Sequence, residues 1–196
     1  MGRPFAPHII TPDSALGGLD IRRSLRFFHG DSAYLRYVPG SAAASSTTFT
    51  FSAWIKRNVI GNTECIAGSD SGSNAFNIFG IDGNDRLMWR VRNSSSVDLT
   101  RKQTNFRLRD TNSWYHLLLE RNTTLSTAED RAKLYINGVR ATDFSTNTND
   151  SQNFTYSSDF LTDLNIGRFD HSSLVIENTC YVISGYNCGS NVEKYQ

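Results

Sequence analysis

A chain of 196 residues with a net charge of +1 is long enough for one large β domain, and it carries no overall field that would recruit nucleic acid or a membrane surface. No stretch is long and apolar enough to span a bilayer, so no membrane partner is expected. Abundant Ser, Thr and Asn, with only 2 Met and 4 Pro, favour strands and polar loops over helices. The first residues lack the basic, apolar and small-residue order of a signal peptide, so none is expected.

The N-terminal residues 1–20 hold three of the four prolines, followed by Gly17-Gly18. Proline removes backbone donors, so this segment predicts an extended arm, which either lies on a neighbouring subunit or is a loose terminus. From residue 24 onward, short segments with strand character alternate with polar turns. The predicted strands comprise residues 24–28, 33–38, 48–57, 64–68, 75–81, 86–92, 114–121, 132–136 and 163–168.

Two other segments read differently from the strands. Residues 126–133 (STAEDRAK) predict one short helical turn, in which Ser or Thr caps the start and Glu129 follows. Residues 169–196 contain apolar runs without clean alternation and predict one strand at most. The three cysteines, Cys65, Cys180 and Cys188, are too few and too odd in number for a disulfide framework and are expected to be reduced thiols.

The stretch AKLYINGVR (132–140) predicts a β-hairpin. Both central residues of a type I′ turn need positive φ, which Asn137 tolerates and Gly138 adopts freely. Side chains alternate along a strand, so Leu134 and Ile136 are expected on one face and Tyr135 on the other.

The same alternation identifies a core shared by several strands. Turn signals recur every dozen residues or so, which is typical of an all-β, antiparallel two-sheet jelly-roll sandwich. Of the adjacent residues Trp114 and Tyr115, one is expected to face inward and the other outward. The expected core residues are Phe49, Phe51, Ile55, Leu117, Leu119, Leu134, Ile136 and Ile166.

A family resemblance emerges from the order of these segments. The series SLRFFHGDSAYL, FTFSAWIKR, RLMWRVR, DTNSWYHLLLERN, AEDRAKLYINGVR and LNIGR resembles the laminin-G/pentraxin-like branch of the concanavalin A-like lectin/glucanase superfamily. It looks most similar to the versions carried by tailed-bacteriophage virion proteins. The resemblance implies an arm at 1–20, a LamG-like jelly-roll domain at 21–168 and an atypical C-terminal segment at 169–196. The closing-strand motif that the family carries, Gly-x-[IL]-x-[DE]-[FV], is missing from that last segment.

A structural calcium ion is a feature that the resemblance implies. The matching ligand is Asp31, whose carboxylate is a hard oxygen donor. Its usual partner acid lies in the missing closing motif, so a turn aspartate that bonds its own backbone is the favoured alternative and no cofactor is expected.

Catalysis is not expected from the sequence. Retaining glycoside hydrolysis needs two carboxylates about 5–5.5 Å apart, whereas the glutamates here are scattered singly. The segment GSDSG (68–72) has Asp where a nucleophile elbow has Ser, and no histidine has the sequence context of a general base.

Carbohydrate binding without catalysis fits the polar loops better. Lectin sites use an exposed aromatic ring to stack on a sugar and polar side chains to bind its hydroxyls. The candidates are Trp89, Arg90, Arg92, Asp70 and Asn74. The alternative is that Trp89 belongs to the core and the loops are merely solvated.

The sequence and the resemblance together predict a non-catalytic module on a phage virion, in a tail, fibre or decoration protein. Its expected partners are a host-surface glycan or polysaccharide and other virion subunits, with a homotrimer as the expected assembly. Such a protein would be made in the host cytoplasm and released by lysis. The alternatives are a purely structural virion domain without a ligand, a polysaccharide-degrading enzyme, and a cellular extracellular adhesion domain.

Overall fold

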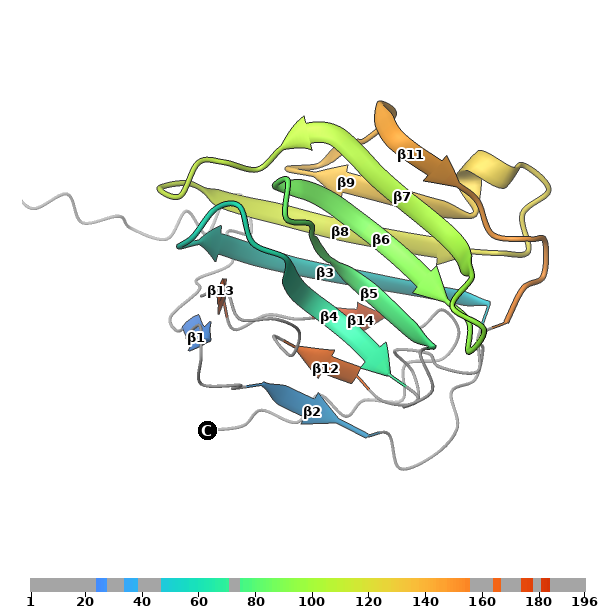
Figure 1. The fold of residues 1–196 in the computed structure, drawn as a ribbon, viewed down its shortest axis with the longest axis horizontal. Helices are drawn as coiled ribbons and strands as arrows, with labels where there is room; N and C mark the ends of the chain where they lie inside the picture. The colour runs from blue at the N-terminus through green and yellow to red at the C-terminus, as the bar shows by residue number, and fades with distance from the viewer. Residues whose placement is uncertain are drawn as a thin grey trace, which may run out of the picture.

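Two antiparallel sheets stack face to face in the computed structural model, which describes residues 24–27, 34–38, 47–70, 75–155, 164–166, 174–177 and 181–183 (Figure 1). Sheet A contains, in spatial order, β1 (Ser24–Phe27), β13 (Leu174–Glu177), β3 (Thr48–Arg57), β8 (Trp114–Asn122), β9 (Ala132–Ile136) and β10 (Val139–Arg140), and β14 (Tyr181–Ile183) also pairs with β3. Sheet B contains β11 (Phe144–Thr148), β7 (Asp98–Arg107), β6 (Arg86–Arg92), β5 (Phe76–Ile81), β4 (Glu64–Asp70), β12 (Leu164–Ile166) and β2 (Leu35–Tyr37). The predicted jelly-roll sandwich is confirmed. No helix in these ranges is long and apolar enough to cross a membrane.

The core lies between the two sheets and follows the predicted alternation. On β3, Phe49, Phe51 and Ile55 are buried, while Trp54 on the opposite face is exposed. Each fully buried apolar side chain contributes roughly 1.5–3 kcal/mol. Six of the eight predicted core residues are buried, and the remaining two, Ile136 and Ile166, are partly buried and pack against the cluster.

The predicted hairpin and helical turn are both present. Asn137 and Gly138 have φ values of 51° and 78°, as a type I′ turn requires, and join β9 to β10. Leu134 is buried, while Tyr135 is half-buried and lies on the other face. A 3₁₀ helix spans Ala128–Asp130; its N-cap residue makes no side-chain capping bond, unlike the predicted cap.

Two strands of sheet B, β7 and β11, were not predicted from the sequence. The inward residues of β7 include Thr100, Lys102 and Thr104, which are buried although they are polar, so the strand shows no apolar alternation. The Lys102 ammonium donates to Asn147 Oδ1 at 2.7 Å and lies 5.0 Å from the centre of the Phe144 ring. These contacts replace the hydration that the ammonium loses on burial.

The C-terminal segment corrects one expectation. Where one strand at most was predicted in residues 169–196, the structure has β13 and β14, and both pair with β3. Strand β13 also pairs with β1, so it lies between β1 and β3 in the sheet. The prediction failed because it relied on alternation within the segment, whereas pairing with β3 is what places both strands in the sheet. The predicted arm at 1–20 and the residues Cys180 and Cys188 lie outside the described residues.

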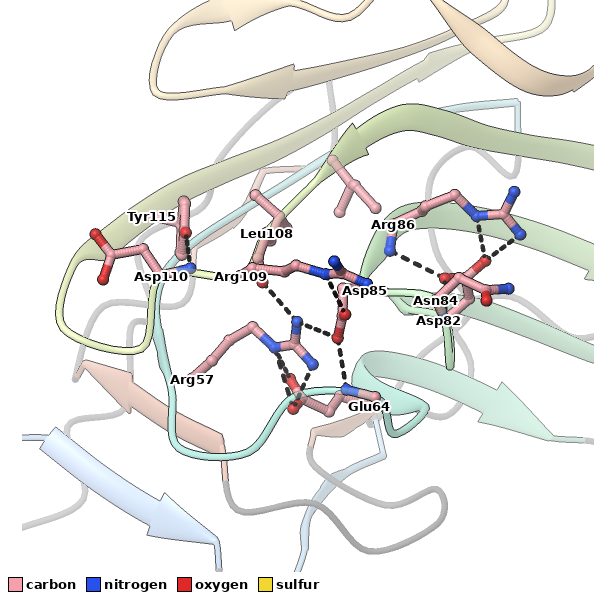
Figure 2. Close-up of polar contacts among 12 residues, drawn as sticks. Arg57, Glu64, Asp82, Asn84, Asp85, Arg86, Leu108, Arg109, Asp110 and Tyr115 are labelled. Carbon is pink, nitrogen blue, oxygen red and sulfur yellow. Dashed lines mark hydrogen bonds and ion pairs between the residues drawn. The ribbon is translucent and has the colours of Figure 1, made fainter.

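A buried ionic cluster holds the end of sheet B to sheet A. Arg57, the last residue of β3, is fully buried and donates from Nε and Nη2 to the Glu64 carboxylate at 3.1–3.2 Å (Figure 2). Its Nη1 donates to Asp85 Oδ1 at 2.9 Å and to the carbonyl oxygen of Leu108 at 2.6 Å. Arg57 therefore connects β3 with β4, with the β5–β6 turn and with the segment after β7.

The Asp85 carboxylate accepts hydrogen bonds from two residues besides Arg57. Its Oδ1 also accepts the amide of Gly61 at 2.6 Å, and its Oδ2 accepts Nε of Arg109 at 2.9 Å. Burial would raise the pKa of Asp85, but the hydrogen bonds from Gly61, Arg57 and Arg109 outweigh it and hold the pKa below its ordinary value of 3.8. The ionised carboxylate is therefore the form that the fold stabilises.

The first prediction compares the two arginines that contact Asp85. Arg57→Ala removes the buried guanidinium that binds both Glu64 and Asp85, and should lower the free energy of unfolding by about 3–5 kcal/mol, although Asp85 keeps its contacts with Gly61 and Arg109. The control is Arg109→Ala, because the Arg109 side chain is 56% exposed and its loss should cost at most about 1 kcal/mol. Urea unfolding measures both, and equal losses would contradict a structural role for the buried cluster.

The second prediction concerns acid stability. Because the folded-state pKa of Asp85 lies below 3.8, its contribution is present above that pH and is lost as the pH falls through the folded-state pKa. The free energy of unfolding should therefore decline as the pH falls below about 4. In Asp85→Asn the decline over this range should be shallower, although the variant is less stable at pH 7. Parallel pH profiles for the two proteins would refute the assignment.

Candidate functional site

Strand β6 positions the candidate binding residues on opposite faces of sheet B. Leu87, Trp89 and Val91 point into the core, and Trp89 is fully buried with its ring edge-on to Phe49 at 5.9 Å between centroids. Trp89 therefore offers no ring face to a ligand. The expectation that it stacks on a sugar is wrong, and the alternative that it belongs to the core is confirmed.

Arg90 and Arg92, the other candidates on β6, lie on the outer face of the same sheet. Their side chains are 22% and 28% exposed. Both donate from Nε to Oδ1 of Asp98, the first residue of β7, at 2.9 Å and 3.1 Å. A third guanidinium, that of Arg101, approaches Oδ2 of the same carboxylate at 3.4 Å. One aspartate thus gathers three arginines.

The surroundings of Asp98 keep it ionised. Burial would raise its pKa, but the hydrogen bonds and charges of Arg90 and Arg92 outweigh this effect and lower the pKa below 3.8. At neutral pH one negative carboxylate therefore faces three positive guanidiniums, and this group of four residues carries a net positive charge.

The ring of Phe76 supports the two arginines from the neighbouring strand. Phe76 on β5 is the cross-strand partner of Arg92. The guanidinium carbons of Arg90 and Arg92 lie 5.4 Å and 5.3 Å from the centre of its ring, within the range of cation–π contacts. With Nε bound to Asp98 and the guanidinium carbons near the Phe76 ring, both guanidiniums are oriented before any ligand arrives.

A continuous polar chain extends this site across the sheet. Arg101 Nε donates to Gln103 Oε1 at 3.0 Å, and Gln103 Nε2 donates to Asp82 Oδ2 at 3.0 Å. Arg86 donates from Nε to the same Asp82 oxygen at 2.8 Å, a contact that Figure 2 also shows. We call these residues the arginine cluster: Phe76, Asp82, Arg86, Arg90, Arg92, Asp98, Arg101 and Gln103.

Several residues of the arginine cluster were not predicted because strand pairing, which the sequence does not show, brings them together. Phe76, Asp98 and Arg101 were not predicted as site residues because only the pairing of β5, β6 and β7 brings them beside Arg90 and Arg92. The available signal was Arg86, Arg90 and Arg92 at even spacing on one predicted strand, which places them on one face.

The remaining predicted site residues are only partly placed. Asp70 ends β4 directly opposite Phe76 in the ladder, which puts it at the edge of the arginine cluster. Asn74 and the predicted calcium ligand Asp31 lie outside the described residues. Among the residues that are described, no group of three or more His, Cys, Asp or Glu side chains could hold a metal ion.

Three buried acids, Glu64, Asp85 and Asp150, are candidates for chemistry because buried acids often mark active sites. Glu64 and Asp85 share Arg57, and Asp85 also pairs with Arg109, so two guanidiniums balance these two carboxylates. Burial raises the pKa of Asp150, which accepts a hydrogen bond from Thr100 and has Arg121 Nε 3.5 Å from its Oδ2. The side chain of Asp150 is 0% exposed, so a bound sugar has no contact with it.

Comparisons with known proteins agree with this architecture. A search of curated proteins finds no match. A heptameric SAP-like pentraxin from Limulus polyphemus has 16% sequence identity and a TM-score of 0.55, with 84% of this chain and 77% of that chain covered. The binding domain of botulinum neurotoxin DC in complex with SialylT has 16% identity and a TM-score of 0.55, over 81% of this chain and 37% of that one.

The neurotoxin chain is much longer than the matched region, and identities this low show the fold alone. The family model Laminin_G_3, described as the concanavalin A-like lectin/glucanases superfamily, matches residues 29–172. Because this match covers more than half of the sequence, the chain belongs to the concanavalin A-like lectin/glucanases superfamily.

Proposed function

We propose that this protein is a carbohydrate-binding module whose ligand surface is the outer face of sheet B around the arginine cluster. The observation that carries the proposal is the pair Arg90 and Arg92, oriented by Asp98 and Phe76 on an open sheet face. Membership of a lectin-containing superfamily supports it, as does the fold shared with a toxin binding domain in complex with SialylT.

The turn between β6 and β7 adds suitable groups at one end of this face. Asn93 Oδ1 accepts the Val97 amide at 2.9 Å, and Ser96 adopts a positive φ of 62°, which makes the turn tight. Ser94 and Ser95 are exposed, and Val97 is 53% exposed. Hydroxyls, an apolar side chain and guanidiniums together match the mixed polar and apolar surface of a sugar ring.

The rival functions find less support in the site. A purely structural domain does not need oriented, partly exposed arginines, since surface ion pairs contribute little to stability. A polysaccharide-degrading enzyme needs an accessible acid pair, whereas Glu64, Asp85 and Asp150 are buried and bound to buried arginines.

We further propose that the module works on a phage particle, as part of a tail, fibre or decoration protein that attaches to host-surface glycan or to other virion subunits. The support is the order of motifs in the sequence. A homotrimer is the proposed assembly. Tail and capsid genes beside the gene for this chain would support the setting, and an unrelated gene neighbourhood would count against it.

The third prediction locates the ligand surface. Ile78 is the cross-strand partner of Arg90, so Ile78→Asp places a competing carboxylate beside that guanidinium on the outer face of sheet B. On a glycan array that includes neutral and acidic sugars, this variant should lose most of the wild-type signal, roughly tenfold or more. The matched control, Leu118→Asp, changes a half-buried residue of β8 on the outer face of sheet A and should bind as wild type.

Three results of this array would count against the proposal. Loss of signal in Leu118→Asp but not in Ile78→Asp would move the site to the other sheet. Equal loss in both, with unchanged thermal stability, would exclude a site confined to sheet B. Absence of binding by the wild-type protein to every glycan would favour the structural alternative.

A further inference from the structure

We propose that the ligand is an acidic sugar, and that Arg90 and Arg92 together receive one sulfate or carboxylate group on it. This inference rests on the proposed carbohydrate-binding function and specifies the chemistry of the same site. Neither the family match nor the similar structures assign a ligand charge to these residues.

The charge of the arginine cluster provides the first argument. In the described part of the structure, the four arginines Arg86, Arg90, Arg92 and Arg101 form ion pairs with two aspartates, Asp82 and Asp98, so these six residues carry a net charge of +2. The whole chain has a net charge of only +1, so this excess is local. Because the pKa of Asp98 lies below 3.8, its carboxylate is ionised at neutral pH and is counted as negative in this sum.

The free donor atoms provide the second argument. Arg90 and Arg92 use Nε to bind Asp98, and in the described part of the structure their Nη atoms donate to no acceptor. Each guanidinium therefore keeps four unused N–H groups, two of which lie on its Nη1–Nη2 edge. Two such edges, on guanidiniums that share Asp98 Oδ1 and lie near one ring, match the several oxygens of a sulfate or the two oxygens of a carboxylate.

The fixed orientation provides the third argument. An exposed arginine normally loses side-chain freedom when it binds an anion, and this loss reduces affinity. Here the contacts with Asp98 and Phe76 have already ordered both side chains. The site is therefore preorganised for an oxyanion.

The size of the charge excess favours a single anionic group over a polyanion. Nucleic-acid binding depends on many phosphate contacts and on an extended basic surface. The four arginines of the cluster lie on two neighbouring strands, β6 and β7. Four guanidiniums, of which two are held over one ring, suit a sugar with one anionic substituent better than a continuous phosphate backbone.

The fourth prediction uses three polymers that share one glucose backbone: dextran, carboxymethyl-dextran and dextran sulfate. Each is immobilised on a biosensor and the equilibrium affinity of the wild-type chain is measured at 150 mM salt, approximately physiological ionic strength. We expect binding to at least one charged polymer. The affinity for uncharged dextran should be lower than for that polymer by roughly tenfold or more. The two charged arms show whether sulfate or carboxylate is preferred.

Two double variants test the residues. Arg90→Gln with Arg92→Gln should reduce affinity for the charged polymer roughly tenfold or more. The control, Lys133→Gln with Arg140→Gln, removes the same two charges from sheet A, where these residues pair with Glu120 and Asp130, and should not change affinity. Equal loss in the two double variants would indicate attraction by net charge alone and would overturn the proposal.

A third double variant separates geometry from charge and covers the case in which the glutamine variant fails to fold. Arg90→Lys with Arg92→Lys keeps both charges but loses the planar forks. We expect a loss of roughly threefold or more; unchanged affinity would contradict recognition by paired guanidiniums.

The results also distinguish this inference from the proposed function. Binding of neutral glycans that Ile78→Asp abolishes, with no preference for charged dextrans, would refute the acidic ligand and leave a carbohydrate-binding site in place. Absence of binding to all glycans and all dextrans would refute both. Higher affinity for immobilised DNA than for dextran sulfate would overturn the acidic-sugar ligand and assign the arginines to nucleic acid.

Discussion

Strict alternation of side chains along β6 is the constraint on which the site depends. The core requires Leu87, Trp89 and Val91 to face inward, and the intervening residues must then face outward. Arg90 and Arg92 are consequently fixed on the outer face by the packing of Trp89 against Phe49 rather than by any contact of their own. A shift of one residue in the register of β6 would bury both arginines and expose the tryptophan.

Ionic contacts then place the neighbouring strands around these two arginines. Arg57 fixes Asp85 in the β5–β6 turn, and Asp82 in the same turn binds Arg86 and Gln103. Gln103 orients Arg101, which in turn contacts Asp98. A path of hydrogen bonds thus connects the buried end of the sandwich to the exposed face, so the geometry of the site depends on the stability of the β5–β6 turn.

The sequence predicted well those features that depend on local patterns. Alternation identified β3 and β8 with their correct faces, and Asn137-Gly138 identified the hairpin turn. It missed β7, where buried positions carry polar residues such as Lys102, and it missed β13 and β14, whose role depends on pairing with β3.

The site residues were likewise predicted only where they share one strand. Arg90 and Arg92 could be chosen from one strand, whereas Asp98 and Phe76 come from its two neighbours, and only the three-dimensional pairing brings them together. Trp89 was chosen because lectins use aromatic rings, but neighbouring residues of a strand point to opposite faces, so it could not share a surface with Arg90. Closer use of the period of two would have excluded it.

Recognition by Arg90 and Arg92 is measured most directly in a ¹H–¹⁵N spectrum of the arginine side chains during titration with a sulfated glucose oligosaccharide. We expect the Nε–H signals of Arg90 and Arg92 to shift most and to saturate together, while the indole signal of Trp54 on sheet A stays in place. Saturable shifts centred on Trp54, with the two arginine signals unchanged, would contradict recognition by these arginines.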